Sequence, residues 1–147
     1  MKIFIGADHA GFELKEKLIP FLKNLGHEVE DKGAYTLDTQ DDYPDFVTPV
    51  AEAVASDPER SRGIVLGGSG EGEAIATDRF PHVRTAVWYG GNKEPLILSR
   101  EHNDANILSL GARMMSEEEA MEAVKLWLET PFSGDERHIR RIEKLDA

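Results

Sequence analysis

The stretch that decides the fold is Ile64–Glu73, with the sequence IVLGGSGEGE. Its apolar beginning is typical of a buried strand, and the segment with alanine and isoleucine that follows predicts the start of a helix. In a glycine-rich turn between a strand and a helix, several backbone N–H groups converge on one point, where an anion can bind. This turn also contains two carboxylates, those of Glu71 and Glu73. Such a conflict between the local rule and the residue type indicates a functional site.

Outside this stretch, short apolar runs alternate with amphipathic segments along the chain. Alternating β and α units predict a parallel sheet with right-handed crossovers and helices on both faces. We therefore expect one α/β domain over residues 1–147: a doubly wound, Rossmann-like, five-stranded parallel sheet with a C-terminal helical tail. The expected strands are 2–6, 27–31, 62–66, 85–89 and 107–110, and the expected helices are 12–25, 44–55, the glycine turn to about 79, 94–101 and 117–129.

The composition excludes several classes of protein. The chain has 147 residues, a formal net charge of −11 and no cysteine, which rules out disulfides, thiolate nucleophiles and cysteine-based zinc sites. Such an excess of negative charge argues against nucleic acid as a partner, although a small anionic ligand is compatible with it. No apolar run approaches the ~18 residues of a membrane span, and no signal-peptide pattern is present. We expect a soluble, cytoplasmic protein with no membrane contact.

Ligands of doubly wound sheets bind beyond the carboxyl ends of the strands. Three segments fall there: residues 6–11 after the first strand, the glycine turn after the third, and residues 111–113 after the fifth. The segment Glu101–Asp104 ends a helix and belongs to the opposite edge of the sheet. It would reach the same site only by curving back or from a neighbouring subunit.

The glycine turn fits neither of the common nucleotide-binding motifs. No Gly-Lys-Ser/Thr follows it, and neither glycine pair has Gly or Ala three residues further on. A structural turn needs only one or two glycines, so we predict that this turn binds a ligand. Glu73, in the first helical turn, is either a partner of the helix dipole or a functional acid.

Two histidine-containing pairs have both a structural and a functional interpretation. Asp8-His9 either caps the next helix and fills a corner, or moves protons and binds an oxyanion at the end of a strand. His102-Asn103 has residue types that are common at helix ends, and it is equally compatible with a catalytic histidine.

Arginines are concentrated near the C-terminus. Arg137 and Arg141 are four residues apart and share one face of a helix, with Arg140 close by. The structural interpretation is a solvated face paired with neighbouring acids. The functional one is phosphate binding, for which the planar guanidinium is well suited.

These motifs together resemble the ribose-5-phosphate isomerase B family, in the wider group that includes bacterial galactose-6-phosphate isomerase subunits. The resemblance extends nearly from end to end. It rests on GADHAGFELK at 6–15, DYPDF at 42–46, GGSGEGE at 67–73, SREHNDAN at 99–106, GAR at 111–113 and RHIRRI at 137–142.

The resemblance implies that Glu73 is the catalytic base. One branch of the family uses a cysteine at the position of Gly67, and the other, which is similar to actinobacterial enzymes, uses a glutamate at the end of the turn. This chain has no cysteine and has Glu73 in the alternative position. Glu71 either raises the pKa of the base by like-charge repulsion or points to solvent, and we favour solvent.

By the same resemblance, the expected activity is the interconversion of D-ribose 5-phosphate and D-ribulose 5-phosphate. His102 opens the sugar ring, Glu73 moves the proton, and the backbone N–H groups of residues 68–72 with Ser69 stabilise the oxyanion. The remaining substrate-binding residues are Asp8, His9, Gly68, Gly70, Glu71, Gly72, Asn103, Arg113, Arg137, His138 and Arg141.

The resemblance implies that the site is built across a homodimer, so we expect a homodimer with a shared active site, or a tetramer made of two such dimers. Residues 131–147 are expected to contact the partner or the phosphate. No cofactor and no metal are expected. Two alternatives stay open: an isomerase of a six-carbon phosphosugar such as allose or galactose 6-phosphate, and a phosphosugar-binding module without turnover.

Overall fold

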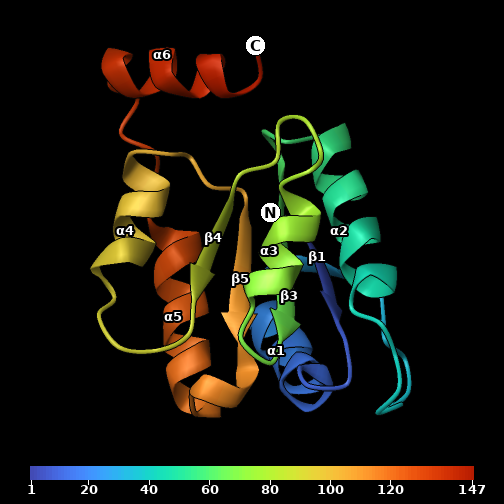
Figure 1. Ribbon diagram of the computed structural model, residues 1–147. Helices are drawn as coiled ribbons and strands as arrows, with labels where there is room; N and C mark the ends of the chain where they lie inside the picture. The colour runs from blue at the N-terminus through green and yellow to red at the C-terminus, as the bar shows by residue number, and fades with distance from the viewer.

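A computed structural model describes all 147 residues and contains one five-stranded sheet (Figure 1). The strands are all parallel and lie in the order β2-β1-β3-β5-β4. The strands are β1 (Lys2–Ala7), β2 (Glu28–Asp31), β3 (Ser61–Gly67), β4 (Thr85–Trp88) and β5 (Ile107–Gly111). The helices are α1 (Phe12–Asn24), α2 (Pro44–Ser56), α3 (Glu71–Thr77), α4 (Glu94–Glu101), the 3₁₀ turn η1 (Ala112–Met114), α5 (Glu117–Glu129) and α6 (Glu136–Leu145).

Helices cover both faces of the sheet. Helices α1, α4 and α5 pack on one face and α2 and α3 on the other, as Figure 1 shows. The central strand β3 is apolar on both faces because it is covered twice. Its Ile64 and Leu66 belong to the larger core cluster, with Trp127 of α5, whereas Val65 belongs to the smaller one, with Val50 of α2.

This architecture confirms the expected fold, and the element bounds differ from the predicted ones by at most two residues. Helix α3 ends at Thr77 rather than near residue 79. The Thr77 hydroxyl donates to the Glu73 carbonyl, and the Asp78 carboxylate accepts from the backbone N–H of Thr85. The chain therefore turns into β4 directly after Thr77.

The C-terminal tail is helical, as expected, and lies away from the carboxyl ends of the strands. In Figure 1 the strand arrows point downward, and α6 crosses the opposite, upper edge of the molecule. The tail is held there by the backbone N–H of Ser133, which donates to the Glu101 carbonyl, and by Asp146, which accepts from the backbone N–H of His82. None of the helices combines the length and the apolar character needed to cross a membrane.

Candidate active site

The glycine turn between β3 and α3 is fixed from the side of β5. The Ser109 hydroxyl donates to the Gly70 carbonyl at 2.6 Å, and the backbone N–H of Arg113 donates to the Gly68 carbonyl at 3.1 Å. Gly70 has φ +86°, a left-handed conformation that side chains disfavour. In a trans peptide the carbonyl and the following N–H point in opposite directions, so the N–H of Ser69 faces away from Arg113. The turn therefore presents backbone donors to the carboxyl edge of the sheet.

The side chain of Glu73 folds back onto the start of this turn. It is buried, with only 4% of its surface exposed. Its carboxylate occupies the space in which a Cβ atom on Gly67 would lie. Gly67 thus provides the recess for this carboxylate, and a side chain at position 67 and the present position of Glu73 exclude one another.

Burial raises the pKa of the Glu73 carboxyl above its ordinary value, because the charged form loses hydration. A hydrogen bond from its own backbone N–H offsets part of this effect, and the negative charge of Asp8 adds to it. A carboxylate with a raised pKa at a ligand-binding edge is suited to proton transfer.

The two glutamates of the turn are in opposite environments. Glu71 is exposed to solvent, and the pKa of Glu73 is raised mainly by burial and to a smaller extent by Asp8, not by Glu71. The backbone N–H of Glu71 donates to the Ser69 hydroxyl oxygen at 3.3 Å. Since that oxygen is the acceptor, the Ser69 hydroxyl hydrogen stays free to donate to a ligand.

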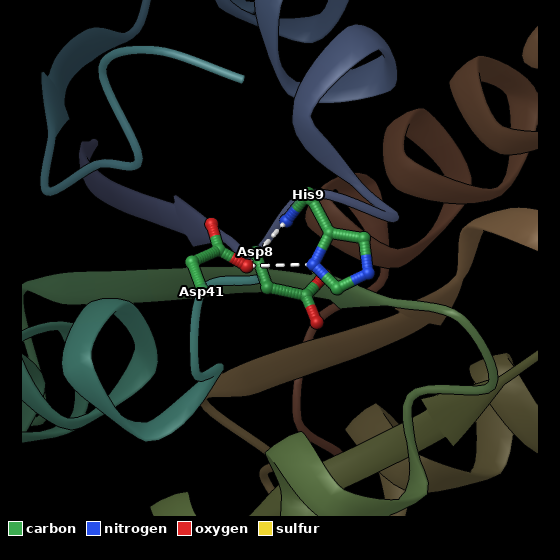
Figure 2. A group of neighbouring side chains, drawn as sticks. All are labelled: Asp8, His9 and Asp41. Atoms are coloured by element: carbon green, nitrogen blue, oxygen red, sulfur yellow. Dashed lines mark hydrogen bonds and ion pairs between the residues drawn. The ribbon is translucent and has the colours of Figure 1, made fainter. Parts of the chain in front are cut away.

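Asp8, His9 and Asp41 form a cluster next to the turn (Figure 2). The Asp8 side chain accepts a hydrogen bond from the backbone N–H of Ala10 in the turn before α1. It does not cap this helix, because the N-cap is Gly11 and no side chain forms a cap hydrogen bond there. His9 does not fill a corner of the core: its ring is one-quarter exposed and pairs with Asp41 over 2.6 Å.

These three residues are the one group whose potential metal ligands approach within 4.8 Å of one another. Two of those atoms, His9 Nδ1 and Asp41 Oδ1, are joined to each other by a hydrogen bond. The arrangement is that of a carboxylate–histidine pair.

Two further side chains border the turn. A Cβ atom on Gly68 would lie 3.3 Å from Arg113 Nη1, so this guanidinium brings positive charge to the glycines. A Cβ atom on Gly72 would lie 2.8 Å from the Tyr43 hydroxyl, so this ring packs directly on the turn.

The other predicted residues lie at the opposite edge of the sheet. His102 follows the end of α4, and its ring stacks on His138 of α6 with the ring centroids 4.3 Å apart. His138 is buried, and its Nε2 has no hydrogen-bond partner within the chain. Burial lowers the pKa of His138, with further contributions from His102 and Arg137. Asn103 is exposed beside this pair.

The arginines of α6 are not paired with the acids of their own helix. Arg137, Arg140 and Arg141 are exposed, and none of them forms an ion pair or a side-chain hydrogen bond in the protomer. The nearby acid Asp146 instead pairs with His82. This disfavours the interpretation of a self-neutralised helix face and leaves a cluster of positive charge in an acidic protein.

The predicted site residues thus form two groups that one protomer does not bring together. The first group is at the carboxyl edge: Asp8, His9, Gly68, Ser69, Gly70, Glu71, Gly72, Glu73 and Arg113. The second is at the opposite edge: His102, Asn103, Arg137, His138 and Arg141.

The largest cleft of the protomer, about 770 Å³, lies beside the second group and not at the glycine turn. It follows the unpaired edge of β4, between the end of α3 and α4, and Asn103 is among its lining residues. Its apolar lining includes Phe80, Val83 and Pro95. A cleft of this kind along an open strand edge is a typical place for another polypeptide to pack.

Sequence reasoning missed two residues of the carboxyl-edge group, Asp41 and Tyr43. Both come from the loop between β2 and α2, which has the polar composition of a solvated connection. Asp41 is 32 residues from His9, so no spacing pattern connects them. The sequence DYPDF at 42–46 is the one signal that could have directed attention to this loop.

Comparisons with known proteins identify the family to which the chain belongs. Residues 3–145 match the family described as Ribose/Galactose Isomerase. Ribose-5-phosphate isomerase B of Mycobacterium tuberculosis is 45% identical over 145 residues, covering 99% of this chain and 88% of that protein.

Solved structures of relatives also resemble this chain over nearly its whole length. Ribose-5-phosphate isomerase B of Mycoplasma genitalium with bound ribulose-5-phosphate has a TM-score of 0.93 at 35% identity, covering 98% of this chain and 93% of that one. The Clostridium thermocellum protein has a TM-score of 0.91 at 45% identity, with 99% and 95% covered. The chain therefore belongs to the ribose/galactose isomerase family.

Proposed function

We propose that this protein interconverts D-ribose 5-phosphate and D-ribulose 5-phosphate. The observation that carries the proposal is the buried carboxylate of Glu73 in the recess of Gly67, beside a turn of backbone donors. Relatives that match over 99% of the chain are ribose-5-phosphate isomerases B, and one solved relative holds ribulose-5-phosphate.

The reaction moves one proton between neighbouring carbons of the open-chain sugar. His102 assists ring opening by transferring a proton to the ring oxygen. Glu73 then removes the proton from C2, which leaves a cis-enediolate, and returns it to C1, while the hydroxyl hydrogen on O2 passes to O1, to give the ketose. The raised pKa of Glu73 favours this step, because a base with a pKa nearer to the working pH is more effective.

Stabilising the enediolate oxygen is the larger part of the task. The backbone N–H groups of the turn and the Ser69 hydroxyl are the donors at this edge, and Asp8 and His9 are placed to bind sugar oxygens. The Arg113 guanidinium beside Gly68 supplies positive charge. This accounts for the carboxylate of Glu73 within an anion-binding turn. The anion that the turn binds is the transient enediolate, which Glu73 generates.

A homodimer with shared active sites resolves the separation of the two groups. A partner subunit would supply His102, Asn103, Arg137 and Arg141 to the glycine turn. Three observations support this: the unpaired arginines, the apolar cleft along the edge of β4 beside Asn103, and Ile75 of α3, which is 60% exposed. In the dimer the substrate phosphate binds these arginines, with His138 beside them.

The experiment is a comparison of kcat/KM for ribose 5-phosphate, allose 6-phosphate and galactose 6-phosphate with the purified protein. We expect turnover of ribose 5-phosphate to be the fastest. A preference for a six-carbon phosphosugar would mean that this sugar is the substrate, and the reaction would still be an aldose–ketose isomerisation. Binding of all three sugars without turnover would reduce the protein to a phosphosugar-binding module and overturn the proposal.

A further inference from the structure

Asp41 is a buried carboxylate that the proposed reaction does not use. Only 7% of its side chain is exposed, although it lies in a polar loop. Its Oδ1 accepts two hydrogen bonds from one residue: from the backbone N–H of His9 at 3.1 Å, and over 2.6 Å to His9 Nδ1. Its Oδ2 is buried and has no partner within the chain.

Such an arrangement is unfavourable for stability alone. Burying a carboxylate costs free energy unless its oxygens are well paired, and here one oxygen is not. We therefore infer that the position of Asp41 serves His9, the one residue with which its side chain forms hydrogen bonds. We propose that Asp41 is a positioning residue that holds the His9 ring and fixes which of its nitrogens faces the substrate.

The geometry determines the orientation of the ring. A carboxylate only accepts hydrogen bonds, so the hydrogen between the two residues lies on His9 Nδ1. Nε2 is then left for the ligand, and Figure 2 shows it on the side of the ring away from Asp41. A carboxylate that orients a histidine in this way is a common supporting element of catalytic and metal sites.

The loop that carries Asp41 is anchored at both ends. At its start, the fully buried Lys15 pairs with Asp31 at 2.8 Å, and Asp31 accepts from the backbone N–H of Gly33. At its end, the Tyr43 ring packs on Gly72 of the glycine turn. Asp41 is therefore held against His9 by contacts outside the pair, as a positioning residue requires.

This proposal rests on the proposed function, in which His9 binds an oxygen of the phosphosugar. That oxygen belongs either to a sugar hydroxyl or to the phosphate. With its hydrogen on Nδ1, the neutral ring accepts at Nε2 from a sugar hydroxyl, whereas the protonated ring donates from Nε2 to a phosphate oxygen. Inhibition by inorganic phosphate distinguishes them: weaker inhibition of an Asp41 variant indicates the phosphate.

The test uses a double-mutant cycle on the full-length protein. We expect Asp41→Ala to lower kcat/KM by about 10- to 100-fold. Asp41→Asn keeps an acceptor for both N–H groups and should recover most of that loss without lowering Tm. In a His9→Ala background, Asp41→Ala should have no further effect, because Asp41 acts through His9. Asp38→Ala is the matched control: this exposed carboxylate of the same loop accepts only from the backbone N–H of Gln40.

A second measurement does not depend on activity. The nitrogen chemical shifts of the five histidines report which ring nitrogen carries the hydrogen, and the His9→Ala spectrum identifies the signals of His9. We expect a hydrogen on Nδ1 in the wild type and a loss of this preference in Asp41→Ala. An unprotonated Nδ1 in the wild type, or equal losses of kcat/KM with and without the His9 ring, would overturn the proposal. Wild-type protein without isomerase activity but with this tautomer would instead count against the proposed function alone.

Discussion

The two edges of the sheet are built in different ways. At the carboxyl edge, the buried Glu73, the fixed glycine turn and the Asp41–His9 pair are all in place within one protomer. At the opposite edge, the arginines of α6 are exposed and unpaired, and His138 retains an unpartnered ring nitrogen. In the proposed function, the first group is a preorganised half-site for proton transfer. The second group supplies the charge and the donors that, in the same proposal, bind phosphate.

Because the two groups lie at opposite edges of the sheet, each can be impaired separately, and the proposed function requires both. If the second group completes a partner's site, an inactivating substitution at one edge and one at the other should restore activity when they are combined in different subunits of a dimer. If both groups act within the same subunit, combining the two variants should restore no activity.

The largest expected effect is a recovery of activity on mixing two inactive variants. Glu73→Gln and His102→Ala should each lose about 10²–10⁴-fold in kcat, because each removes a proton-transfer group. Unfolding and refolding a 1:1 mixture produces heterodimers in which one site carries both substitutions and the other carries neither. Activity should then return to about a quarter of wild type. A mixture as inactive as its components would show that both groups act in the same subunit.

The next effect concerns the recess at Gly67. A methyl group there would occupy the space of the Glu73 carboxylate, so Gly67→Ala should displace the base and lower kcat on the order of 10²-fold. Steady-state kinetics checks this. In a Glu73→Gln background the same substitution should cost much less, since the base is already absent. Equal losses in both backgrounds would indicate a defect of the turn itself.

The features behind these two substitutions are not equally predictable from the sequence. The β3–turn–α3 unit was predictable because a strand, a glycine turn and a helix start are encoded by neighbouring residues. The helices 94–101 and 117–129 were predicted with the bounds observed. The position of His102 at the far edge also followed from the topology of a parallel sheet.

The Asp41–His9 pair could not be predicted in this way. It joins residues 32 positions apart through a polar loop with no periodic pattern. The recess that Glu73 fills could not be predicted either. Glycines in a turn suggest backbone freedom, whereas Gly67 is needed because the absence of a side chain leaves space for the Glu73 carboxylate. Tertiary contacts of loops are the part of this site that local rules do not contain.

A smaller effect is expected for the arginines of the second group. Arg137→Ala should raise KM for ribose 5-phosphate by about 10- to 100-fold with little change in kcat, because a charge-assisted phosphate contact is lost. Arg140→Ala is the matched control on the same exposed helix and should change KM by less. Reactions of phosphate-free sugars should be unaffected by either substitution. A fall in kcat instead of a rise in KM would assign Arg137 to the chemical step.

The smallest effect is a rise in stability when the base is neutralised. The pKa of Glu73 is raised in the folded state, so between its ordinary value of 4.5 and the raised value the folded protein binds more protons than the unfolded chain. The stability contributed by this group is therefore complete below pH 4.5 and falls as pH rises through the folded-state pKa. Glu73→Gln should raise Tm at pH 7, by ~2–4 °C for each kcal/mol regained, and should have little effect near pH 4. Thermal melts at both pH values measure this difference. A variant that melts below the wild type at pH 7 would mean that the glycine turn stabilises the Glu73 charge instead of tolerating it.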